Sequence, residues 1–156
     1  MLSGGLESGF AISPDHQHLY MPDTYWSRGT RGTRIDVVTI YDAKTLNTTA
    51  EVIIPSRQLS IPDHTQEGVT PDGRFLLVTN MTPATSVTVV DLHDNKFLGK
   101  IDTPNCTEVF VTGARRFSAI CGDGTMMSVT MDDGGKAAGQ KRVGPFFDPE
   151  KDPVLF

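Results

Sequence analysis

A repeated pair of short apolar runs constrains this chain more than any other feature of its sequence. In the central copy, Phe75–Asn80 and Ser86–Leu92 are rich in β-branched residues, and the turn signal Thr70-Pro71-Asp72-Gly73 precedes them. Gly73 can adopt the positive φ that a tight hairpin requires. A second turn is expected at Met81–Thr85, which contains a proline. Two such runs bounded by turn residues indicate a β-hairpin.

The same pattern occurs on both sides of this hairpin. Upstream, Ser13-Pro14-Asp15 takes the turn position and Val37–Asp42 the following strand, while Thr112–Phe117 and Ser128–Asp132 take these places downstream. The aspartates that end the three equivalent strands are 49 and 41 residues apart, and we interpret them as turn formers; they are Asp42, Asp91 and Asp132. Four-stranded propeller blades repeat at roughly 40–50 residues. The sequence therefore predicts an all-β chain of β-propeller blades, each with four antiparallel strands.

Three blades are expected within one partial β-propeller domain that covers residues 1–156. Their approximate bounds are 6–54, 65–103 and 106–143, and residues 144–156 should lead into a further blade. The loop Thr24–Arg34 of the first blade is longer than its counterpart Met81–Thr85, which explains the longer first repeat. The expected strands are Gly9–Ser13, His18–Asp23, Asp36–Asp42 and Thr49–Ile54; Glu67–Thr70, Phe75–Thr79, Ser86–Leu92 and Lys96–Asp102; and Thr107–Thr112, Arg116–Cys121, Met126–Met131 and Ala138–Val143.

Length and charge limit the classes of protein that remain. Three blades cannot close a ring, and open propeller edges would leave backbone groups unpaired. We therefore expect the chain to be part of a longer protein, cut at both ends; completion by its own oligomer is the alternative. The net charge of −5 argues against nucleic-acid binding. No apolar run approaches the ~20 residues of a membrane span, and no signal peptide is visible.

A few polar residues invite a chemical interpretation. His16 and His18 have a spacing possible for metal ligands, but no third ligand lies nearby in sequence, which favours a solvated turn. Arg28, Arg31 and Arg34 could clamp an anion or a carboxylate of a partner, or simply form a flexible charged loop. No nucleophile–base pair, phosphate loop or pair of acids is evident. The residues alone therefore indicate a scaffold with no catalytic residues and no metal site.

The two cysteines lie symmetrically about a predicted turn. Cys106 and Cys121 are equidistant from the turn expected at Gly113-Ala114, so they should face each other on adjacent antiparallel strands. A disulfide can form there if the two residues occupy a non-hydrogen-bonded site; two buried free thiols are the alternative. A disulfide would imply an oxidising compartment.

Three segments together resemble one known family. They are YWSRGTRGTRIDVVTIYDAKTL, TPATSVTVVDL, and RRFSAICGDGTMMSVTMDDGGKAAG continuing to FFDPEKDPV. These segments resemble the heavy, non-quinone subunit of the bacterial quinoprotein amine dehydrogenases, which include the methylamine and aromatic-amine enzymes. The motifs TPATS and ICGDG are nearer to the aromatic-amine branch. The resemblance covers nearly the whole chain in register, including the long loop of the first blade.

The resemblance implies a division of labour between subunits. The family has a seven-bladed propeller in the periplasm, of which about three blades would be present here, in a heterotetramer with small, disulfide-rich light subunits. The light subunit carries tryptophan tryptophylquinone, performs the oxidative deamination and passes electrons to a blue-copper protein of the amicyanin or azurin type. The quinone is made from two tryptophans, whereas this chain has only Trp26, so no cofactor is expected in this chain. Cys106 and Cys121 match the paired heavy-chain cysteines of the family.

The resemblance also suggests where the substrate passes. Gly4–Glu7 and Thr24–Arg34 should lie at the same face of the propeller, where we expect both to reach the light subunit. A phenylalanine in the family's equivalent of Gly4–Glu7 narrows the channel to the quinone, and Leu6 takes its place here. Leu6 would give the channel a different shape, or it simply caps the core of the blade.

Two other classes of protein fit a propeller. A stand-alone propeller could bind a protein or a cell-wall ligand without enzyme activity. A hydrolase of the lactonase kind would need metal ligands along the central channel, and the sequence offers no such set.

Overall fold

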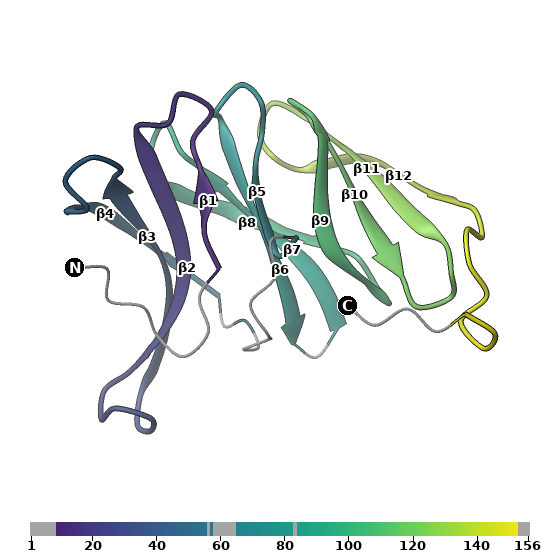
Figure 1. The fold of residues 1–156 in the computed structure, drawn as a ribbon, viewed down its shortest axis with the longest axis horizontal. Coiled ribbons are helices and arrows are strands. Elements are labelled where there is room, and N and C mark those ends of the chain that lie inside the picture. The colour runs from purple at the N-terminus through teal and green to yellow at the C-terminus, as the bar shows by residue number, and fades with distance from the viewer. Residues whose placement is uncertain (1–8, 56, 58–64, 83, 153–156) are drawn as a thin grey trace.

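Three four-stranded antiparallel sheets make up the described part of the chain (Figure 1). The computed structural model describes residues 9–55, 57, 65–82 and 84–152, and none of these residues forms a helix that could cross a membrane. The strands of each sheet are neighbours in chain order, which confirms the prediction of four-stranded propeller blades. They are β1 (Ala11–Ile12), β2 (His18–Trp26), β3 (Arg34–Asp42) and β4 (Thr48–Ile54); β5 (Glu67–Val69), β6 (Phe75–Thr82), β7 (Ala84–Asp91) and β8 (Lys96–Asp102); and β9 (Cys106–Gly113), β10 (Arg116–Cys121), β11 (Met126–Met131) and β12 (Ala137–Val143).

The three sheets lie side by side and diverge from one another, and the core fills the space between successive sheets (Figure 1). On β6, Phe75 and Leu77 pack toward the third sheet, whereas Leu76 and Val78 pack toward the first. Successive side chains of a strand point to opposite faces, so the continuous apolar run FLLV is what a sheet buried on both faces requires. The second sheet therefore lies between the first and the third.

An aspartate ends or directly follows each third strand and closes the following turn. The Oδ1 atom of Asp42 accepts hydrogen bonds from the N–H groups of Lys44 and Thr45, at 3.0 and 2.7 Å. Asp91 and Asp132 bind the backbone after β7 and β11 in the same way. A short side chain that bonds the backbone two residues ahead stabilises a turn. The interpretation of these aspartates as turn formers is therefore confirmed.

Two of the predicted loops are shorter than expected because strand pairing continues into them. The loop predicted at Thr24–Arg34 is strand at both ends, since Trp26 still pairs with Arg34. The turn predicted at Met81–Thr85 is likewise mostly strand, since Thr82 pairs with Ala84. Polar residues suggested a loop at Thr24–Arg34 and a proline suggested one at Met81–Thr85. An antiparallel pair can nevertheless extend beyond the buried part of its sheet. The hairpin formed by β2 and β3 consequently projects below the body of the molecule (Figure 1).

Candidate functional site

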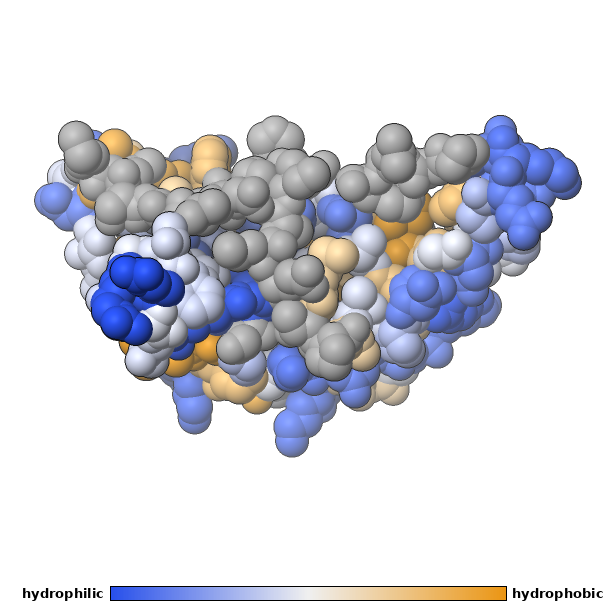
Figure 2. Space-filling view, turned by 90° about the horizontal axis from the view of Figure 1, so that it is seen from below, coloured by the Kyte–Doolittle hydropathy of each residue, from blue (hydrophilic) through white to orange (hydrophobic). Residues whose placement is uncertain are grey.

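The tip of the β2–β3 hairpin, residues 27–33, is closed by its own backbone. Ser27 N–H donates to the carbonyl of Thr33 and Arg28 N–H to the carbonyl of Arg31, both at 3.0 Å. The positive φ of Gly29, +74°, explains the glycine at the turn, because other residues rarely adopt that conformation. Arg28 and Arg31 are exposed at this tip, which forms a strongly hydrophilic patch at the left of Figure 2.

The three arginines predicted to clamp a partner divide into two groups. Arg34 makes a two-point ion pair with Asp36, Nε to Oδ2 at 2.8 Å and Nη2 to Oδ1 at 2.9 Å. Its guanidinium also lies 5.8 Å from the ring centroid of Trp26. Arg28 and Arg31 take part in none of the ion pairs within the described residues. Arg34 therefore stiffens the base of the hairpin, and the two arginines of the tip face solvent.

Buried polar side chains also hold the base of the hairpin. The hydroxyl of Thr24 donates to Asp36. Arg57 is only 3% exposed, and its Nη2 donates to the carbonyl of Pro22 at 2.8 Å. Burial lowers the pKa of Arg57, although Glu67 and Asp36 act in the opposite direction. A buried charge is costly unless it is paired, so these contacts hold the base of the hairpin in one position. The sequence suggested no role for Arg57, which lies in the segment between two blades.

Leu6 and the segment Gly4–Glu7 lie outside the described residues. Their predicted contact with the substrate channel and the light subunit stays a prediction.

Cys106 and Cys121 form a disulfide, in agreement with the predicted pairing. The two residues are opposite each other on β9 and β10. Their N–H groups donate elsewhere, to the carbonyls of Thr103 and Thr125, both at 2.9 Å. The pair is therefore a non-hydrogen-bonded site, at which opposite side chains approach most closely. Both sulfurs are buried in the core between the second and third sheets.

Of the two histidines, His16 lies in the predicted solvated turn, whereas His18 begins β2 beside it and is half-buried. His16 occupies the exposed β1–β2 turn with a φ of +58°, and the ring of His18 stacks on that of Tyr20 with centroids 6.3 Å apart. Within the part of the chain that the structure describes, no three His, Cys, Asp or Glu side chains gather in a way that could hold a metal ion.

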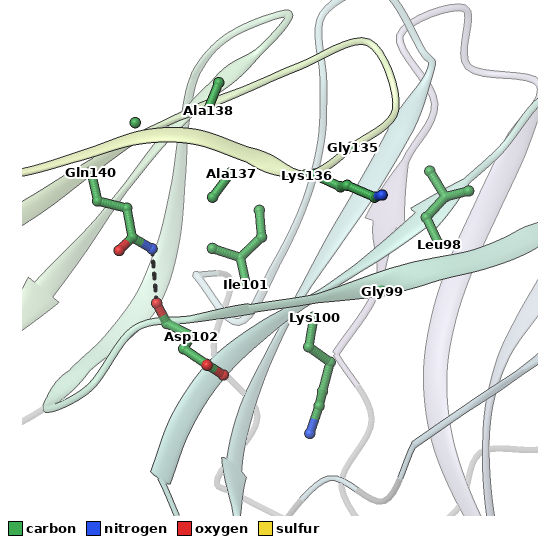
Figure 3. Close-up of a pocket in the computed structure, with 11 residues that line it drawn as sticks. Leu98, Gly99, Lys100, Ile101, Asp102, Gly135, Lys136, Ala137, Ala138 and Gln140 are labelled. Carbon is green, nitrogen blue, oxygen red and sulfur yellow. Dashed lines mark hydrogen bonds between the residues drawn. The ribbon is translucent and has the colours of Figure 1, made fainter.

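A groove of about 430 Å³ runs between β8 and β12, the outermost strands of two neighbouring sheets (Figure 3). Glycines and alanines make up five of its eleven lining residues, and the others include Leu98, Ile101 and Gln140. Gln140 Nε2 donates to the carbonyl of Asp102 at 2.9 Å and joins the two strands. The residues that line this groove include no nucleophile–base pair.

One ion-pair network joins the second and third blades. Arg115 Nη1 donates to Asp72 Oδ2 at 2.5 Å, and Arg115 Nε donates to Asp133 at 3.0 Å. The guanidinium lies 4.8 Å from the centroid of the Phe75 ring. Partial burial acts to raise the pKa of Asp72, but hydrogen bonds from Thr70 and Arg115 outweigh it and lower that pKa to about 2.

Replacing Arg115 with methionine should make the free energy of unfolding depend less steeply on pH in the acid range. The folded-state pKa of Asp72 lies below its ordinary value of 3.8, so ionised Asp72 stabilises the protein above pH 3.8 and this contribution is lost as the pH falls toward about 2. The side chains are 28% and 36% exposed, so solvent limits the loss at neutral pH to about 1 kcal/mol or less. Urea denaturation at a series of pH values measures both effects. Arg116→Met is the control, because Arg116 is exposed and takes part in none of the ion pairs among the described residues. If stability falls with pH in the Arg115→Met variant as steeply as in the wild type, the assignment is contradicted.

The sheets and their contacts define the chain as a β-propeller protein. The family model described as methylamine dehydrogenase heavy chain matches residues 1–156. The chain belongs to the methylamine dehydrogenase heavy chain family.

Named relatives agree with the family match. The methylamine dehydrogenase heavy chain of Methylophilus methylotrophus is 29% identical over 156 residues, which cover 99% of this chain and 38% of that protein. The heavy chain of Methylorubrum extorquens is 30% identical over 136 residues, which cover 86% of this chain and 33% of that protein. The chain thus spans only 33–38% of these relatives' length. Because both are methylamine dehydrogenase subunits, the expected closeness to the aromatic-amine branch gains no support.

Solved structures agree on the fold. The Dos1 propeller has a TM-score of 0.61 at 13% identity, covering 95% of this chain and 38% of that one. The β-propeller domain of the trilobed protease from Pyrococcus furiosus has a TM-score of 0.55 at 12% identity, covering 90% and 43%. At such low identity these likenesses concern the propeller fold alone.

Proposed function

We propose that this chain supplies propeller blades of the heavy, non-quinone subunit of an amine dehydrogenase. The observation that carries the proposal is the family match over all 156 residues. In this function the propeller is a scaffold for a light subunit, which bears tryptophan tryptophylquinone and oxidises a primary amine. Electrons then pass to a blue-copper protein. The relatives' greater length supports further blades that complete a ring of seven.

The quinone belongs on the partner subunit in this proposal. It is made from two tryptophans, and this chain has one. That residue, Trp26, lies in β2 beside the guanidinium of Arg34. The chain's own residues therefore do not fit this group, and its contribution is to hold and orient the light subunit.

The periplasm is the proposed location. The disulfide between Cys106 and Cys121 supports it, because disulfides persist in oxidising compartments.

The β2–β3 hairpin is the proposed contact with the light subunit. It projects from the body of the molecule (Figure 1), and its base is fixed by the Arg34–Asp36 pair and by Arg57. A rigid base with two exposed arginines at its tip can bind carboxylates of a partner at little cost in ordering. Leu6 remains the proposed channel residue at the same face.

Reversing the charge of the tip tests this contact. We expect Arg28→Glu combined with Arg31→Glu to weaken binding of the light subunit by about tenfold or more, because like charges would then face each other across the interface. Surface plasmon resonance with the immobilised light subunit measures the Kd. Lys44→Glu, on the exposed β3–β4 turn, is the control and should leave the Kd unchanged. Equal binding by the double variant and the wild type would exclude the hairpin from the interface, and no binding by the wild type would contradict the proposed function.

A further inference from the structure

The turns that open the first two blades have the same construction. Ser13 Oγ donates to Asp15 Oδ1 at 2.6 Å, and Thr70 Oγ1 donates to Asp72 Oδ1 at 2.6 Å. In both turns the same oxygen also accepts a backbone N–H, from Gln17 and from Arg74. The second carboxylate oxygen of each aspartate is therefore available to a group outside its own turn.

At the junction of the second and third blades, that group is a guanidinium. Arg115 of the third blade donates to Asp72 Oδ2 and lies over the ring of Phe75, the first residue of β6. A cation between a carboxylate and an aromatic face is stabilised by both. The repeat thus contains one occupied cation site between neighbouring blades.

At the junction of the first and second blades, the corresponding position is a cleft of about 260 Å³. Asp15, His18 and Tyr20 line it from the first blade, and Pro71 and Gly73 from the second. The N–H of Ser13 donates to the carbonyl of His18, just as the N–H of Thr70 donates to the carbonyl of Phe75. His18 therefore takes the place of Phe75 in the first blade. The stacked rings of His18 and Tyr20 give this cleft an aromatic wall beside the Asp15 carboxylate.

The residue that could fill the cleft from within the chain binds elsewhere. Arg74 is the counterpart of Arg115. The carbonyl of Arg74 accepts the N–H of Leu92, which follows β7, and the carbonyl of Arg115 accepts the N–H of Met131, which ends β11. Both Nε and Nη2 of Arg74 donate to Asp91 Oδ2 of its own blade, at 3.0 and 2.9 Å. Gly73 contributes no side chain. Among the described residues, no ion pair involves Asp15.

We propose that this cleft binds an organic cation, a guanidinium or an alkylammonium group. The cation would contact Asp15 Oδ2 and lie against the rings of His18 and Tyr20, as Arg115 contacts Asp72 and Phe75. The cleft lies at the opposite end of β2 from the projecting hairpin, so the site goes beyond the proposed contact with the light subunit. The cation can come from a small molecule or from an arginine or lysine side chain of another protein.

Titration of the purified protein by NMR, with no light subunit present, tests the site. The probes are n-butylguanidinium and the blocked tripeptide acetyl-Gly-Arg-Gly-amide. We expect both to shift the amide resonances of the β1–β2 turn and the ring resonances of His18 and Tyr20. A tripeptide Kd at least tenfold lower than that of n-butylguanidinium would identify a protein segment as the ligand, whereas similar values would identify a small molecule.

Three variants separate binding from structural disturbance. Asp15→Asn keeps the acceptor for Ser13 but removes the charge, and we expect it to weaken binding about fivefold. Asp94→Asn, on an exposed turn of the second blade, is the matched control and should bind as the wild type does. His18→Phe copies the occupied junction and should tighten binding about twofold. The proposal is overturned if neither probe shifts these resonances, or if Asp15→Asn and Asp94→Asn bind equally well.

Discussion

Replacing Phe117 with alanine is expected to destabilise the protein by about 3–5 kcal/mol. Phe117 is fully buried, at 0% exposure, between the second and third sheets, where it packs with Phe75 and Val129. Removing the ring forfeits its burial and leaves a cavity, because strands fixed by their ladders on both sides can close in only partly. Urea denaturation followed by far-UV circular dichroism measures the loss.

An exposed phenylalanine provides the control for this experiment. Phe146 is 65% exposed, so Phe146→Ala should change the free energy of unfolding by about 0.5 kcal/mol or less. A loss below about 1 kcal/mol for Phe117→Ala would mean that the two sheets do not share the core described above.

Removing the disulfide is expected to cost about 3 kcal/mol, because it closes a loop of 15 residues. The cost arises mainly in the unfolded chain, which gains freedom when the link is absent. The double variant Cys106→Ala/Cys121→Ala is compared with the wild type by urea denaturation. A reducing agent should destabilise the wild type by a similar amount and leave the double variant unchanged.

Peptide mapping without reduction gives an independent check of the disulfide. Protein exported to an oxidising compartment should yield one peptide pair linked through Cys106 and Cys121. Recovery of both residues as alkylated free thiols would contradict the disulfide and remove its support for a periplasmic location.

The fold was accessible from the sequence because the same turn and strand pattern occurs three times. The run Phe75–Val78 shows what this pattern could not predict, namely the order of the sheets. Its apolar residues indicated a strand, but only the packing of alternate residues against two different sheets shows that the second sheet is the central one. Contacts between blades join residues that are far apart in sequence, such as Arg115 and Asp72. No local pattern indicates them.

The cysteine pairing was predicted correctly although the turn was misplaced by one residue. Gly113 pairs with Arg116, so the turn is centred on Ala114-Arg115 rather than on Gly113-Ala114. Two irregularities of β9 shift the register back and bring Cys106 opposite Cys121. One of them contains Glu108, whose φ is +63°. Non-glycine residues rarely adopt this conformation, so the sequence gives no signal for such a bulge.

The hairpin was recognised as a long segment, but the separate role of Arg34 was not predicted. Arg34 and Asp36 are two residues apart, so in a strand they lie on one face and can pair. That signal was available in the sequence, but it is informative only if β3 begins at Arg34. The expected strand began at Asp36, which left Arg34 in the loop with Arg28 and Arg31.

Amine-dependent reduction of a redox dye tests the proposed scaffold role most directly. The purified protein alone and its co-purified complex with the light subunit are assayed with the same primary amine, and their visible spectra are recorded. We expect no quinone absorbance and no dye reduction for the protein alone, and both for the complex. Turnover of the amine by the protein without a light subunit would contradict the scaffold role.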